Sequence, residues 1–119
     1  MDSNRQQKVG KLFQEELAEA FRKWASDLFP GNLISVTEVK VTSDLSIAKV
    51  FVSIFPTDKK DEILQEINVQ TPYFRGILSK GAAKNMRLTP ELIFKLDPTL
   101  DEMDKIDRAL SGKGNNPIL

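Results

Sequence analysis

The chain has 119 residues, of which 40% are hydrophobic, and its 17 Lys and Arg residues are balanced by 17 Asp and Glu residues. This length supplies one domain with a modest core. Cysteine and histidine are absent, which excludes disulfides, thiolate nucleophiles, Cys/His zinc sites and His-based acid–base catalysis. Because the net charge is zero, any nucleic-acid binding has to come from a local basic patch.

No run of residues approaches the roughly 20 apolar positions of a membrane span, and the start of the chain lacks the apolar segment of a secretion signal. We therefore expect a soluble, cytoplasmic protein without a membrane partner, monomeric when free. Residues 1–110 are expected to form the single domain. Residues 111–119, rich in Gly and Asn, are expected to be a flexible tail.

Residues 3–29 are predicted to form a long amphipathic helix, because apolar side chains recur at three- and four-residue steps. Ser3 and Gln6 fit a capping box at its start. Phe29-Pro30-Gly31 ends it, since proline cannot continue the helical hydrogen bonds. The apolar side chains are Val9, Leu12, Phe13, Leu17, Ala20, Phe21, Trp24 and Leu28.

Two β-strands are predicted over 33–42 and 47–55, joined by a turn at Ser43-Asp44 into an antiparallel hairpin. The apolar phase shifts between Val36 and Val39, which indicates a bulge or bend. In the second strand only one face is uniformly apolar, and that face should carry the helices. Its residues are Ala48, Val50, Val52 and Ile54.

The remaining pattern predicts a helix over 58–69, a second helix starting after Gln70, a third strand over 92–96 and a last helix over 99–110. The order of elements is helix, strand, strand, helix, helix, strand, with a terminal helix appended. We therefore predict an α+β fold with helices on one face of a small three-stranded mixed sheet.

The stretch from Thr71 to Pro90 contains four basic residues and no acidic residue. With Thr71 as N-cap and Pro72 at the first helical position, Lys80, Lys84 and Arg87 fall within an arc of roughly 60° on a helix. Phe74, Ile77, Leu78, Gly81 and Ala82 cluster on another side. The pattern predicts a basic helix face that could bind an anion. The alternative is a merely solubilising surface.

Three strings stand in order along the chain: Arg5-Gln6-Gln7-Lys8-Val9, then Ser43-Asp44-Leu45 leading into Ala48-Lys49-Val50-Phe51-Val52-Ser53, and Met86-Arg87-Leu88-Thr89-Pro90-Glu91-Leu92 with Phe94. Asp97 and the Ile106/Leu110 segment extend them to about residues 5–110. In this combination the chain resembles the ribosome-binding factor A family, bacterial assembly factors of the small ribosomal subunit.

The resemblance implies a type II KH-like fold in which the third strand lies parallel to the first beside the hairpin. It also implies binding to small-subunit rRNA within the immature small ribosomal subunit, in late maturation and rRNA processing, without catalysis or cofactor. The family's Ala-x-Gly helix junction is replaced here by Gln70-Thr71-Pro72, so the resemblance does not give the geometry of that junction.

The expected RNA contacts come from backbone recognition by a helix face and helix start. Arg75 suits a phosphate clamp and Gly76 would let an RNA backbone approach closely. Tyr73 is a candidate for base stacking, whereas Phe74 falls on the apolar side. The RNA-binding candidates are Arg5, Lys8, Tyr73, Arg75, Gly76, Lys80, Lys84 and Arg87.

Two other features of the sequence have alternative interpretations. Phe51 points to the sheet face opposite the helices, so the open sheet face or the C-terminal helix could instead bind a protein partner, in a non-catalytic interaction module. The acidic group Asp101, Glu102, Asp104 and Asp107 suits an exposed helix face rather than a metal site. No catalytic residue, metal ligand or enzymatic activity is predicted.

Overall fold

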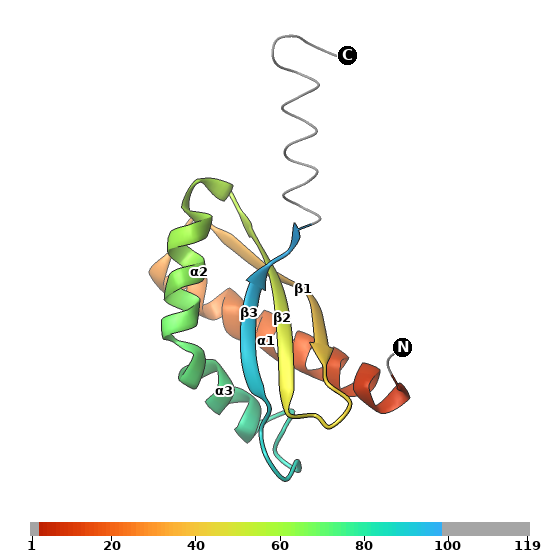
Figure 1. Ribbon diagram of the computed structural model, residues 1–119. Helices are drawn as coiled ribbons and strands as arrows, with labels where there is room; N and C mark the ends of the chain where they lie inside the picture. The colour runs from red at the N-terminus through yellow and green to blue at the C-terminus, as the bar shows by residue number, and fades with distance from the viewer. Residues whose placement is uncertain (1–2, 99–119) are drawn as a thin grey trace.

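The computed structural model describes residues 3–98 and shows an α+β fold (Figure 1). The terminal helix predicted over 99–110 and the tail over 111–119 lie outside the described residues. The elements are α1 (Asn4–Leu28), β1 (Leu33–Val41), β2 (Ile47–Phe55), the short 3₁₀ helix η1 (Thr57–Lys59), α2 (Lys60–Val69), α3 (Thr71–Lys80) and β3 (Glu91–Leu96). Element order and type match the prediction throughout this range.

The sheet has the strand order β1-β2-β3, with β1 antiparallel to β2 and β3 parallel to β2. β3 therefore runs opposite to β1, so the expected parallel relation to the first strand is wrong. The helices α2 and α3 form the crossover that a parallel pair requires. The pairing of β1 with β2 shifts between Val36 and Glu38, which confirms the predicted bulge.

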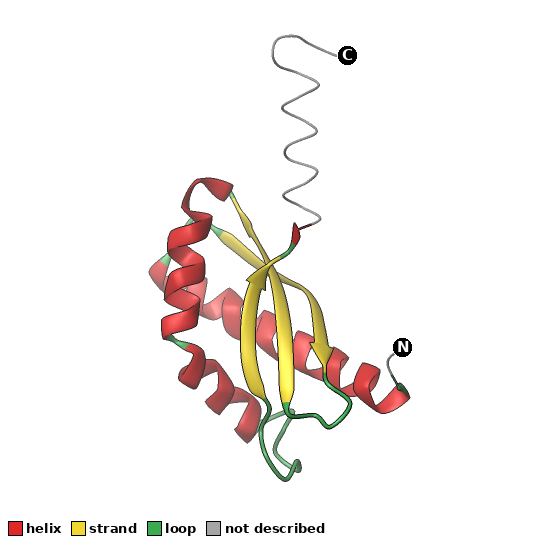
Figure 2. Ribbon diagram, in the orientation of Figure 1, coloured by secondary structure: helices red, strands yellow, loops and turns green. Residues whose placement is uncertain are grey.

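The helices cover one face of the sheet, with α1 crossing it and α2 and α3 lying alongside (Figure 2). The β2 residues that face them are the predicted set, Ala48, Val50, Val52 and Ile54, none more than 2% exposed. On the opposite face Phe51 is half-buried, and Lys49 and Lys95 are exposed. The described residues place no helix over that opposite face.

The capping box of α1 is confirmed: the Gln6 N–H donates to Ser3 Oγ, and the Ser3 N–H donates to Gln6 Oε1. The buried stripe of the helix is narrower than predicted, since Leu12 and Leu28 are 52% and 53% exposed. Leu12 lies about 100° or more around the helix from the packed face. Leu28 is in phase with that face, but it is the last residue of the helix. The buried residues are Gly10, Phe13, Leu17, Phe21, Trp24 and Ala25.

An aromatic cluster joins α1, α3 and β3. The Phe21 and Phe74 rings have centroids 4.5 Å apart, and Phe94 lies 5.8 Å from Phe21 and 5.9 Å from Phe74. Trp24 meets Phe74 edge-on at 5.6 Å. Phe74 is completely buried, which confirms its predicted place in the core. This cluster fixes α3 to the body of the domain.

Gly10 lies where α1 approaches β1 most closely. A Cβ atom at this position would stand 2.7 Å from the carbonyl oxygen of Val39, a backbone atom that cannot turn away. We expect Gly10→Ala to lower the free energy of unfolding by about 1–3 kcal/mol, the usual cost of overpacking, measured by urea denaturation. Gly76→Ala is the control, because nothing lies within 4 Å of its Cβ. That variant should gain up to about 1 kcal/mol from helix propensity, and an equal gain for Gly10→Ala would contradict the close approach.

Candidate nucleic-acid interface

The junction between α2 and α3 is a kink at a single residue. Gln70 ends α2 and immediately precedes α3, with φ −93° and ψ 15°. Its carbonyl accepts from the N–H groups of Tyr73 and Phe74. Thr71 is not the N-cap that the sequence predicts, since it lies inside the helix and its hydroxyl donates to the Asn68 carbonyl at 2.9 Å. The two helices therefore meet without a loop.

α3 ends at Lys80, earlier than its amphipathic pattern predicts. Gly81 adopts φ −121° and ψ −107°, and the Ala83 N–H reaches back to the Leu78 carbonyl at 2.7 Å. Lys84 and Arg87 therefore lie in the loop over 81–90 and do not share a helix face with Lys80. The predicted basic helix face is wrong, and the basic charge of this stretch is divided between the end of α3 and the loop.

The loop over 81–90 is held firmly at several points. Ala83 is 2% exposed and packs in the core. Arg75 donates from Nε to the Pro90 carbonyl at 3.1 Å and from Nη2 to the Thr89 carbonyl at 2.6 Å. Two of its three guanidinium nitrogens thus bind the protein's own backbone. The sequence predicts a phosphate contact for Arg75 and contains no signal for this role in fixing the loop.

The turn between β1 and β2 lies at the same end of the molecule as the loop over 81–90 (Figure 2). Asp44 accepts hydrogen bonds from the hydroxyl groups of Thr42 and Ser46, each at 2.8 Å, and from the Ser46 N–H at 3.1 Å. The Ser46 hydroxyl, followed by that of Thr42, lowers the pKa of the Asp44 carboxyl. The Glu91 N–H donates to the Ser46 carbonyl at 2.9 Å, so the turn is joined to the start of β3.

Arg5 and Arg87, far apart in the sequence, line one hollow of about 360 Å³. A second hollow of about 500 Å³ shares Leu45, Ser46 and Leu88 with it. We call the surface formed by these adjoining hollows the loop end. It also includes a third hollow of about 180 Å³ that shares Arg75 with the second and is lined by Gly76. The residues of the first hollow are Arg5, Ser43, Asp44, Leu45, Ser46, Asn85, Met86, Arg87 and Leu88.

The loop end gathers some of the predicted RNA-binding residues and leaves others apart. Arg5, Arg75, Gly76 and Arg87 line its hollows. Lys80 and Lys84 are exposed but line none of the hollows described above. The other two candidates are Tyr73, 54% exposed on α3, and Lys8, which lines a separate hollow on α1 with Lys11 and Glu15.

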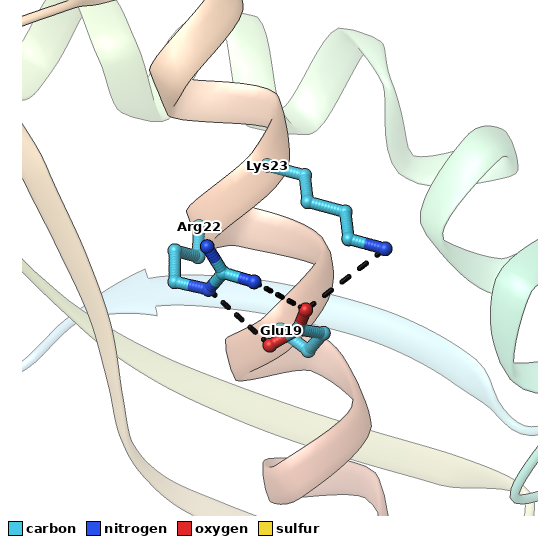
Figure 3. A network of polar contacts seen from close by, with 3 residues as sticks. All are labelled: Glu19, Arg22 and Lys23. Carbon is cyan, nitrogen blue, oxygen red and sulfur yellow. Dashed lines mark hydrogen bonds and ion pairs between the residues drawn. The ribbon is translucent and has the colours of Figure 1, made fainter.

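The cations of the loop end form no ion pairs within residues 3–98. Within residues 3–98 the ion pairs join Glu19 to Arg22 at 2.5 Å and to Lys23 at 3.9 Å, all on α1 (Figure 3). The hydrogen bond from Arg22 lowers the pKa of Glu19, and that same bond raises the pKa of Arg22. In the same range no carboxylate pairs with Arg5 or Arg87. Their charge is available to an anionic ligand.

Among the described residues no group of three or more acidic side chains could hold a metal ion. None of the helices within residues 3–98 is long and apolar enough to cross a membrane. The acidic group over 101–107 lies outside this range.

The family model of ribosome-binding factor A matches residues 5–110. The chain belongs to the ribosome-binding factor A family. A ribosome-binding factor A from Flavobacterium johnsoniae is 42% identical over 119 residues, covering 99% of this chain and 91% of the relative. Another from Cytophaga hutchinsonii is 41% identical over 93% of this chain and 84% of the relative. The family predicted from the ordered strings is confirmed.

The fold agrees with this family. The crystal structure of ribosome-binding factor A from Thermus thermophilus superposes with a TM-score of 0.63 at 22% identity, covering 76% of this chain and 94% of the other. A homology model of the Thermus thermophilus protein, fitted into a cryo-EM map of its complex with the 30S subunit, gives 0.56 at 20% identity, covering 82% and 97%. The chain has the family's KH-like α+β fold, as the sequence predicts.

Proposed function

We propose that this protein binds rRNA of the immature small ribosomal subunit through its loop end. Family membership supports the ribosome as the target, and the Thermus thermophilus relative has been placed in a 30S complex. The main support for this RNA-binding surface is that Arg5 and Arg87 line one hollow. Neither forms an ion pair with a carboxylate among residues 3–98.

The loop end has the chemistry of a backbone reader. Two guanidinium groups offer paired N–H donors to phosphate oxygens. Lys80 and Lys84 add exposed charge nearby in the sequence, at the end of α3 and in the loop. Gly76 leaves open space beside Arg75 for a close approach of the sugar–phosphate chain. Tyr73 is an exposed ring on which a base can stack.

The proposed role is assistance in late maturation and rRNA processing in the cytoplasm, as a monomer and without chemistry by the factor. A small, preformed basic surface can occupy its rRNA site until the subunit's own folding makes that site unfavourable. The absence of His and Cys from the whole chain removes His-based acid–base catalysis and thiolate nucleophiles.

Salt dependence tests the electrostatic basis of this proposal. If about four phosphates are neutralised, log affinity for purified small ribosomal subunits should fall against log salt with a slope of about −3 to −4. Fluorescence anisotropy of the labelled protein, with Mg²⁺ held constant, measures it. A slope near zero would show that the loop-end charges do not contact phosphate.

The open sheet face supports a second candidate function, binding of a protein partner. Phe51 is half-buried there, and its neighbours across the sheet are Glu38 on β1 and Lys95 on β3. Ile93 pairs with Lys49 on the same face. Aromatic side chains are enriched at protein contacts. Such binding should survive nuclease treatment and fail on Phe51→Asp.

A further inference from the structure

Glu16 is an acidic side chain that binds the backbone of the loop over 81–90. It lies on α1, and its Oε1 accepts a hydrogen bond from the Ala82 N–H at 2.6 Å, across 66 positions of sequence. A carboxylate that accepts from a backbone N–H makes a charge-assisted bond, stronger than a neutral one. α1 thus holds the loop directly where α3 ends.

The Glu16 carboxylate occupies the space where a side chain at position 81 would lie. A Cβ atom at Gly81 would overlap the Glu16 carboxylate oxygens. Any larger residue there would push the Glu16 side chain off the Ala82 N–H. The glycine is therefore required for close approach to a side chain, rather than for a left-handed backbone, since its φ is −121°.

The bond to Glu16 decides where the chain goes after α3. The Gly81 N–H and the Ala83 N–H both donate to the Leu78 carbonyl, at 3.1 Å and 2.7 Å. The Ala82 N–H between them is the donor that Glu16 takes. With Ala82 held by Glu16 and Ala83 buried, the loop leaves α3 in one direction, toward the hollow that Arg87 lines.

We propose that Glu16 is a positioning residue for RNA binding, which presents the basic loop by clamping the Ala82 N–H. This inference rests on the proposed function of the loop end. Glu16 itself is an acid and repels phosphate, so its removal would favour RNA by charge alone. A loss of RNA affinity on its removal therefore cannot come from the removed charge itself.

Glu16→Ala is expected to weaken binding to small ribosomal subunits about tenfold or more, the scale of one lost charge-assisted hydrogen bond. Glu16→Gln should recover most of the affinity, because its amide oxygen can still accept from Ala82. Asp27→Ala is the matched control: it removes the same charge from an exposed position on α1 and should leave affinity unchanged or slightly raised.

A double-mutant cycle with Gly81→Ala isolates the clamp. Gly81→Ala should weaken binding about as much as Glu16→Ala, because both free the Ala82 N–H. The double variant should bind no worse than either single one, since the same contact is lost in all three. Losses that multiply in the double variant would overturn the proposal.

The ¹H–¹⁵N spectrum of the free protein separates the clamp from the function. The Ala82 amide should shift and exchange faster with solvent in Glu16→Ala, but not in Asp27→Ala. An unmoved Ala82 amide overturns the clamp whatever the binding data. A responsive Ala82 amide with affinity retained in Glu16→Ala overturns the positioning role alone. If the wild-type chain does not bind the subunit while Ala82 responds, the proposed function fails and the contact stands.

Discussion

Lys84→Glu combined with Arg87→Glu is expected to weaken binding to the small ribosomal subunit by about a hundredfold or more. Both side chains are exposed in the loop over 81–90, and neither has a carboxylate partner within residues 3–98. A charge-assisted hydrogen bond contributes about 1.5–3 kcal/mol, so losing two of them corresponds to a hundredfold or more. Reversal of the charge adds repulsion from phosphate. Co-sedimentation with purified subunits measures the loss.

The fold should be unaffected by this double substitution. The loop is fixed by buried Ala83, by Glu16 and by the bonds from Arg75 to Thr89 and Pro90, none of which involves the substituted side chains. Far-UV circular dichroism and the thermal midpoint should match the wild type. A loss of folding would place the two side chains in the structure instead of the interface.

Lys49→Glu combined with Lys95→Glu is the matched control, because it changes the net charge equally on the open sheet face. These lysines are exposed on β2 and β3 beside Phe51. If RNA binds at the loop end, this variant should retain most of its affinity for the subunit. The reverse outcome, loss on the sheet face and retention at the loop, would favour the protein-interaction candidate.

The strands and α1 could be predicted because their signals are local. The capping box of Ser3 with Gln6 and the alternation of Ala48, Val50, Val52 and Ile54 each depend on residues close together in the chain. The bulge after Val36 also left a mark, since it shifts the apolar phase at that point. Such local patterns can be recognised in the sequence without knowing which elements pack against them.

The end of α3 could not be predicted, because it coincides with a contact from another helix. The spacing of Lys80, Lys84 and Arg87 fits one face of a continuous helix, and Gly81 is the only residue among them that indicates a helix end. Just beyond the last residue of the helix, a carboxylate from α1, Glu16, accepts a hydrogen bond from the Ala82 N–H. A single sequence contains no signal for a contact between residues so far apart.

The candidate site was affected in the same way. The sequence predicts that Arg5 and Arg87 both bind RNA, but not that they lie together. Their meeting in one hollow follows from the β1–β2 turn, which lies between the start of α1 and the loop. The direction of β3 could not be predicted from local sequence either, because it depends on the tertiary structure. The crossover through α2 and α3 places β3 beside β2 and parallel to it.

Phe74→Ala is expected to lower the free energy of unfolding by about 3–5 kcal/mol, the usual cost of removing a fully buried aromatic ring. Phe74 is 0% exposed and contacts the rings of Phe21, Trp24 and Phe94. For a domain of this size, each kcal/mol lowers the thermal midpoint by about 4–8 °C. Differential scanning calorimetry should therefore show a fall of at least about 12 °C.

Tyr73→Ala separates this effect from RNA binding. Tyr73 is the preceding residue on α3 but is 54% exposed, so its removal should change stability by less than about 1 kcal/mol. If the ring stacks on a base, the variant should lose about 1–3 kcal/mol of binding free energy while keeping its fold. A large loss of stability would place the Tyr73 ring in the core, and unchanged affinity would remove it from the interface. Since the two residues are neighbours on one helix, the pair shows whether α3 turns one aromatic ring to the core and the next to RNA.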